Sequence, residues 1–122
     1  MKITRFEDLD CWKASRELVK QVFEISQDGA FVKDWDSKSQ FRRAALSVMN
    51  NIAEGFARYH DNEFKRFLDI AQSSAAEVKS MLYVFEDLKY LNEDVIKELH
   101  QKVDKARNFT LAFIRYLDNK KK

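Results

Sequence analysis

Proline is absent from this chain of 122 residues, and glycine occurs only twice. Tight turns between β-strands favour both residue types, so their scarcity argues against an all-β fold. No run of about eighteen apolar residues is present that could span a membrane, and the opening residues, MKITRFEDLD, lack the apolar stretch of a signal peptide. These absences predict a soluble, cytoplasmic protein that has no membrane segment and is built from helices.

Cysteine and net charge are also scarce. Cys11 is the only cysteine, which excludes a disulfide within the chain, and its place in an apolar helical row with Leu18 and Val22 predicts a buried thiol. The net charge of +2 is too small for overall charge to drive nucleic-acid binding. Such binding would need a local concentration of positive charge. The lysines at positions 120–122 form one, but we expect a frayed, solubilising end there.

Apolar residues recur at helical spacing in four segments, which predicts helices at about residues 8–28, 37–59, 62–90 and 93–118. Two joints between these segments are very short, one around His60 and Asp61 and the other around Leu91 and Asn92. Short joints place successive helices antiparallel. The predicted fold is therefore a single all-α domain, an antiparallel up-down-up-down four-helix bundle.

The longest connection is predicted between the first and second helices. Gly29 is well placed to cap the end of the first helix in a left-handed conformation. Phe31 and Trp35 follow it, and we expect both rings to pack back onto the bundle.

Three further residues give local signals. Gly55 lies inside the second predicted helix, where glycine costs roughly 1 kcal/mol relative to alanine, so it predicts the close approach of another helix. Asp61 and Asn92 precede the third and fourth predicted helices and are expected to cap them.

The stretch QFRRAALSVMNNIAEGFARYH, residues 40–60, has a polar face of unusual composition. It contains no lysine, although exposed helix faces favour lysine and glutamate. Serine and asparagine are poor helix formers because their side chains compete for the backbone, so a helix that retains them is expected to use them. The residues of this polar stripe are Gln40, Arg43, Ser47, Asn50, Asn51, Glu54 and Arg58, with Arg42 beside it. We interpret the stripe as a structured contact surface; the alternative is a solvated face.

The third predicted helix carries candidate partners for this stripe and an additional apolar sector. Glu63, Ser74 and Glu77 are expected to join the stripe in a partly buried network. Four apolar side chains widen the apolar sector beyond what one helix pair requires, and we expect them to form an interface with another subunit. They are Ile70, Met81, Val84 and Leu88.

Catalytic and metal-binding patterns are missing. Di-iron helical bundles use Glu-x-x-His pairs, but Ala57 and Lys97 stand three residues before His60 and His100, and both histidines are expected to be exposed. Ser47 has no histidine at helical spacing to act as its base, and neither glycine belongs to a phosphate-binding loop. We therefore expect no enzyme activity, metal or cofactor.

With these motifs in place, the chain resembles the four-helix-bundle proteins encoded in intervening sequences of bacterial 23S ribosomal RNA genes. The resemblance covers nearly the whole chain and is most specific in the second helix. It is carried by Phe6, Leu9, Trp12-Lys13, Gln40-Phe41-Arg42-Arg43-Ala44-Ala45, Ser47-Val48, Asn51-Ile52-Ala53-Glu54-Gly55, Arg58, Glu63-Phe64, Phe67-Leu68, Ile70-Ala71, Ser73-Ser74 and Glu77. It implies a homo-pentameric ring and a sister group, the accessory variability determinants of diversity-generating retroelements. Those proteins are basic and bind nucleic acid and a reverse transcriptase, whereas this chain is nearly neutral.

Two functions remain as hypotheses. The first is binding of structured RNA, in which the arginines at 42, 43 and 58 contact phosphates and Asn50 and Asn51 act as neutral donors. The second is an assembly or scaffold protein that acts through protein–protein contacts only. In that case the polar stripe lies between subunits or inside the bundle, where Glu54 can neutralise Arg43 and Arg58. An enzyme, the third class, has no catalytic constellation to support it.

Overall fold

The computed structural model describes residues 3–120, and every regular element in this part of the chain is helical. The elements are the short 3-10 helix η1 (Phe6–Asp8), α1 (Asp10–Ile25), a second 3-10 helix η2 (Gly29–Val32), α2 (Trp35–Phe56), α3 (Asp61–Asp87) and α4 (Glu93–Lys120). The predicted all-α fold is confirmed. None of these helices is both long enough and apolar enough to cross a membrane. Lys121 and Lys122 of the predicted frayed end lie outside the described residues.

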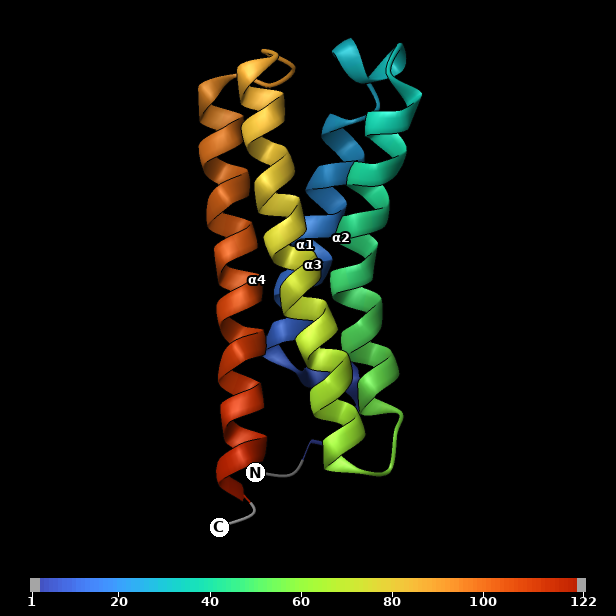
Figure 1. Ribbon diagram of the computed structural model, residues 1–122, viewed down its shortest axis with the longest axis vertical. Coiled ribbons are helices and arrows are strands. Elements are labelled where there is room, and N and C mark those ends of the chain that lie inside the picture. Colours follow the sequence, from blue (N-terminus) through green and yellow to red (C-terminus); the bar gives the residue numbers. More distant parts are fainter. Residues whose placement is uncertain (1–2, 121–122) are drawn as a thin grey trace.

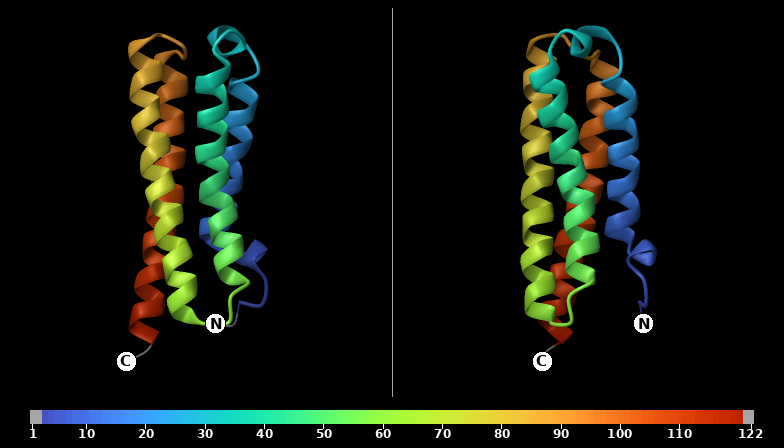
Figure 2. Two further views of the ribbon diagram at one scale, coloured as in Figure 1. Left: turned by 45° about the vertical axis from the view of Figure 1, so that its right-hand side comes forward. Right: turned by 90° about the vertical axis from the view of Figure 1, so that its right-hand side faces the viewer.

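The four long helices lie side by side as antiparallel rods (Figure 1). The α1–α2 and α3–α4 connections are at one end of the bundle, and the α2–α3 connection is at the other (Figure 2). Each helix packs against the next along the chain, and α1 also packs against α4, which closes the bundle. This is the up-down-up-down arrangement that the short joints predict.

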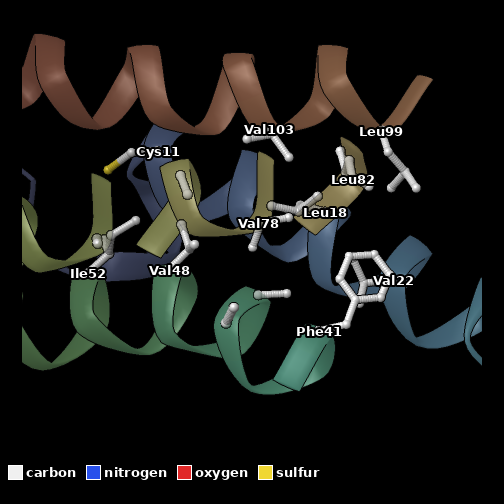
Figure 3. Close-up of a cluster of buried hydrophobic side chains, with 14 of the residues drawn as sticks. Cys11, Leu18, Val22, Phe41, Val48, Ile52, Val78, Leu82, Leu99 and Val103 are labelled. Atoms are coloured by element: carbon white, nitrogen blue, oxygen red, sulfur yellow. The ribbon is translucent and has the colours of Figure 1, made fainter. Parts of the chain in front are cut away.

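All four helices contribute to one apolar core. Figure 3 shows its centre, where Leu18 of α1, Val48 of α2, Val78 of α3 and Val103 of α4 converge and are fully buried. Cys11 is buried among them, as predicted, and its burial raises the pKa of the thiol to about 12. The core fixes which face of each helix remains for contacts outside the bundle.

The α1–α2 connection is only partly packed. Phe31 is buried, with its ring centroid 5.0 Å from that of Phe85, as predicted. Trp35 is 70% exposed, so the expectation that it packs onto the bundle is wrong. Asp34 caps α2 by accepting a hydrogen bond from the Ser37 amide at 3.1 Å. Its other carboxylate oxygen accepts the Tyr90 hydroxyl at 2.8 Å. This bond lowers the pKa of Asp34 and raises that of Tyr90.

Three of the predicted helix ends extend too far, and α1 ends at Ile25 rather than at residue 28. α2 ends at Phe56 rather than at residue 59, because residues 57–60 are needed to reverse the chain before α3 begins. α3 ends at Asp87, where Lys89 takes a left-handed conformation with φ of 59°. The Tyr90 amide then donates to the Phe85 carbonyl at 2.9 Å and that of Lys89 to the Glu86 carbonyl at 3.1 Å. This is a Schellman end formed with lysine instead of the usual glycine.

The predicted caps have mixed outcomes. Asn92 caps α4 by accepting the Val95 amide at 2.9 Å, as expected. Asp61 is not a cap but the first residue of α3, where its charge still favours the positive end of the helix dipole. Gly29 has the expected positive φ of 66°, but α1 has already ended at Ile25 with Ser26 as its C-cap, so this glycine opens η2 instead.

Candidate functional site

The polar stripe of α2 meets α3 through its middle residues. The hydroxyls of Ser47 and Ser74 are 2.8 Å apart, across the two helices. The Asn51 amide nitrogen donates to the Ser47 carbonyl at 2.8 Å and to its hydroxyl at 3.0 Å. All three side chains are half-buried. These side chains therefore form a small polar cluster, Ser47–Asn51–Ser74, at the edge of the α2/α3 seam.

One turn further toward the C-terminal end of α2, the two helices approach closely at Gly55, as the sequence predicts. A Cβ atom at Gly55 would lie 2.7 Å from the Cβ of Phe67 and 3.0 Å from Cδ1 of Phe64. Such distances are shorter than van der Waals contact, so only glycine fits here without moving α3.

The charged residues of the stripe face solvent. Arg58 Nη2 lies 3.5 Å from Glu54 Oε1, and its guanidinium lies 4.8 Å from the centre of the Phe67 ring. Arg43 Nη2 donates to the Ser39 hydroxyl at 3.4 Å. Gln40 and Asn50 are exposed. The stripe thus combines a bonded middle with an open, charged periphery.

Arg42 has a different role from its neighbour in the sequence. Its Nε donates to the Ser26 hydroxyl at 2.8 Å, and Nη2 donates to the Phe23 carbonyl at 3.0 Å. The guanidinium also lies 4.4 Å from the centre of the Phe23 ring. Carbonyls at a helix C-terminus lack partners within their own helix and lie at the negative end of its dipole. Arg42 therefore caps α1, a role that periodicity along α2 does not reveal.

Two of the three expected network partners do not join the stripe. Glu63 Oε1 accepts from Arg66 Nε at 3.1 Å within α3, and this bond lowers the pKa of Glu63. Glu77 is exposed and forms no hydrogen bond or ion pair within residues 3–120. Acidic side chains at the surface keep their hydration, so proximity along a helix does not require pairing. Only Ser74 is placed where the network was expected.

The apolar row of α3 lies beside the stripe. Ile70, Val84 and Leu88 are 39%, 50% and 55% exposed. They follow the same three- and four-residue spacing as Ser74, which contacts α2, so they occupy the α2 side of α3. Met81, the fourth residue of the expected interface, is half-buried and packs against the core. The assembly surface suggested by the sequence thus retains three of its four apolar members.

The residues weighed for catalysis are dispersed. Cys11 is buried, and its raised pKa keeps it a thiol rather than a reactive thiolate. His60 is exposed, but the expectation that His100 is exposed is wrong. His100 is half-buried, with its ring 4.8 Å from that of Tyr83 and Nδ1 3.2 Å from Lys79 Nζ. Within residues 3–120, no cluster of three or more histidine, cysteine or acidic side chains is arranged to hold a metal ion.

Comparison with known proteins agrees with the geometry of the helices. The sequence profile of the 23S rRNA-intervening sequence protein family matches residues 7–111. The chain belongs to this family. The fold is similar to the crystal structure of a protein with unknown function from the S23 ribosomal protein family of Bacteroides thetaiotaomicron VPI-5482, with a TM-score of 0.78 and 17% identity. That match covers 85% of this chain and 97% of the other. No curated protein matches the sequence.

Proposed function

We propose that this member of the intervening-sequence family is a non-enzymatic assembly protein. It associates with copies of itself through the face formed by the polar stripe of α2 and the apolar row of α3. The observation that carries the proposal is the exposure of Ile70, Val84 and Leu88 along one side of α3. Val84 and Leu88, one turn apart, form an apolar patch that a partner surface would cover, and Ile70 lies on the same side of α3 about four turns away, beyond Ser74 and Glu77.

The energetics support such a contact. Full burial of one large apolar side chain contributes roughly 1.5–3 kcal/mol. Because each of the three is already about half-buried, completing their burial would contribute a few kcal/mol per subunit by the same area rule. In a closed ring, the patch of each subunit would pack against the next subunit, so every subunit would take part in two such contacts. The Ser47–Asn51–Ser74 cluster supplies a polar border in which the two hydroxyls and the Asn51 amide nitrogen are already hydrogen-bonded.

Several finer features belong to the same proposal. The number of subunits is five, and the protein is related to the accessory variability determinants. Its location is the cytoplasm. A ring of five predicts a solution mass five times the chain mass of 14.5 kDa.

Phosphate contact by the stripe itself is a separate prediction. Arg43 and Arg58 are exposed, but Arg58 already lies beside Glu54. Arg42 uses two of its nitrogens on α1. These contacts favour assembly as the main role of the α2/α3 face.

Light scattering on size-separated protein tests the assembly proposal. Val84→Lys and Leu88→Lys each place a charge in the apolar row, so both variants should lower the subunit number while circular dichroism keeps the wild-type helicity. Tyr59→Lys is the matched control, because Tyr59 is 99% exposed in the α2–α3 connection, outside the apolar row. Met81→Lys is unsuitable, since Met81 also packs against the core. A wild-type protein that is monomeric at micromolar concentration contradicts the proposal.

A further inference from the structure

The start of α2 carries an exposed tryptophan. Trp35 is 70% exposed, and Val32, three residues earlier, is 64% exposed. Tryptophan has the largest aromatic ring system and is enriched where proteins contact partners. Trp35 contacts none of the other aromatic rings in the described chain at stacking distance. Its indole is therefore available for stacking.

Trp35 borders a shallow pocket of about 300 Å³ on the outer surface of α2. The pocket is lined by Trp35, Lys38, Ser39, Arg42, Arg43 and Leu46. These positions recur every three or four residues, so they share one face of a single helix. Three of the six are cations and none is an acid. The volume is at the lower end of the range for small-molecule sites.

One of the two arginines of this pocket is held in place before any ligand arrives. Arg42 is fixed by its two bonds to the end of α1, and these leave its Nη1 without a partner among residues 3–120. Arg43 is bonded to the Ser39 hydroxyl through Nη2. The nearby carboxylate of Asp34 is engaged by Tyr90 and Ser37, and Asp36 does not line the pocket. The charge of Arg42 is thus positioned, and no acid lines the pocket to neutralise its three cations.

We propose that this pocket binds one nucleotide of a single-stranded nucleic acid. The base stacks on the indole of Trp35, and the adjoining phosphate is contacted by Lys38 and Arg43, with Arg42 providing a fixed charge behind them. An aromatic platform beside cations is the usual arrangement for binding single strands, because every base has a face that can stack. A duplex does not suit the site, since its bases are stacked on one another and not available to Trp35.

The site shares Arg43 with the polar stripe, and the other five residues that line it lie outside the stripe and the apolar row. Its six residues come from one helix of one chain, and Arg42 links it to α1, whereas Ser47 and Asn51 link the polar stripe to α3. A monomer would therefore contain the whole nucleotide pocket. Failure of assembly leaves the site intact, and failure of nucleotide binding leaves the α2/α3 face intact.

The experiment measures fluorescence anisotropy of labelled twelve-nucleotide single strands, one of RNA and one of DNA, at low and moderate salt. The wild-type chain should bind at least one of them, and affinity should fall as salt rises because phosphate contacts release counterions. Trp35→Ala should weaken binding about tenfold, the effect expected for one stacked base. Tyr59→Ala removes an even more exposed aromatic ring elsewhere and should leave affinity unchanged.

Charge and stacking are tested separately. Arg43→Gln should weaken binding. It should also reduce the salt dependence of the affinity by the amount expected for the loss of about one phosphate contact. Arg16→Gln, an exposed arginine on α1, is its control. In a Trp12→Phe background Trp35 is the only tryptophan, so tryptophan fluorescence reports on this residue alone. Stacking of a base on its indole should quench that fluorescence.

Four results would overturn the proposal. They are the absence of binding at low salt, equal losses in Trp35→Ala and Tyr59→Ala, equal competition by duplex of the same length, and equal competition by a glutamate-rich peptide. The last would assign the pocket to an acidic protein segment instead. Helicity measured by circular dichroism must stay at the wild-type value in each variant. Trp35→Phe keeps a stacking ring and should therefore retain most of the affinity.

Discussion

The two edges of α3 are bonded to their neighbours by different means. Toward α2 the contacts are made by small groups, the bare backbone of Gly55 against Phe67 and the paired hydroxyls of Ser47 and Ser74. Toward α4 they are made by long polar side chains. Those pairs are Lys65 with Asp118 at 2.7 Å, Arg107 with Gln72 at 3.1 Å and Lys79 with Asp104 at 2.9 Å.

The difference decides how each edge tolerates change. Small groups bring two backbones close together, and close-packed atoms cannot yield to an added methyl group. Long charged side chains reach across the surface, where water competes for them and solvent screens them. We therefore expect the α2 edge to be sensitive to single atoms and the α4 edge to be tolerant of whole side chains. Four substitutions test this contrast, in order of decreasing effect.

Gly55→Ala should have the largest effect. Alanine is the better helix former by about 1 kcal/mol, but the added Cβ would lie 2.7 Å from the Cβ of Phe67, an atom fixed to the α3 backbone. Overpacking of this kind costs roughly 1–3 kcal/mol. If overpacking costs about 3 kcal/mol, subtracting the gain in helix propensity of about 1 kcal/mol leaves a net loss of stability of about 2 kcal/mol. Urea denaturation measures this loss. Asn50→Ala, on the exposed face of the same helix, should be slightly stabilising. A stabilised Gly55→Ala protein would show that the seam is not close-packed.

Ser74→Ala removes the hydroxyl that joins α3 to Ser47. The Ser47 hydroxyl keeps the bond from Asn51, so the loss should be about 1 kcal/mol, the usual contribution of one hydrogen bond. Ser73→Ala changes an exposed neighbour and should alter stability by less than about 0.5 kcal/mol. Equal losses in both variants, again by urea denaturation, would remove the distinction between the bonded and the exposed serine.

Asp104→Asn breaks the ion pair with Lys79 on the α4 edge. The two side chains are 52% and 33% exposed, so solvent screens the pair and its loss should cost less than about 0.5 kcal/mol. The difference from wild type should shrink further in high salt. A loss as large as that of Gly55→Ala would mean that the two edges are equally sensitive.

His100, at the edge between α3 and α4, should make the stability of the protein weakly dependent on pH. Burial lowers its pKa below the ordinary value of 6.5, with the Lys79 charge adding to the effect and Asp104 and Glu86 opposing it. The unfolded chain therefore binds a proton at a higher pH than the folded chain. The free energy of unfolding should fall as the pH drops below about 6.5. His100→Gln should reduce this slope between pH 7.5 and 5.5, and an unchanged slope would assign it to other groups.

Much of this architecture is readable from the sequence. Helical periodicity locates four helices, the short joints order them antiparallel, and an interior glycine marks a close contact between α2 and α3. These signals succeed because they depend on spacing along one chain segment. Asn92 could be identified as a cap for the same reason, since its partner is three residues away.

The errors share a different cause. Arg42 belongs to α2 by sequence but is used by the end of α1, sixteen residues from Ser26. Trp35 looks like a core residue by composition, yet the space beside η2 is already filled by Phe31. Lys89 adopts a conformation for which glycine is the usual signal. Met81 and Glu77 lie one turn apart on the same side of α3, yet Met81 packs against the core and Glu77 is exposed, a difference that spacing does not predict.

The order of apolar and polar residues along the chain was thus enough to determine the number of helices, their direction and their buried faces, because those properties follow from the helical repeat and the hydrophobic effect. The rotation of each helix against its neighbours was decided only when the four rods packed. That rotation turned one arginine of an adjacent pair inward to cap α1 and left the other beside an exposed tryptophan. Contacts between side chains distant in the chain depend on such rotations, and these are a property of the assembled core.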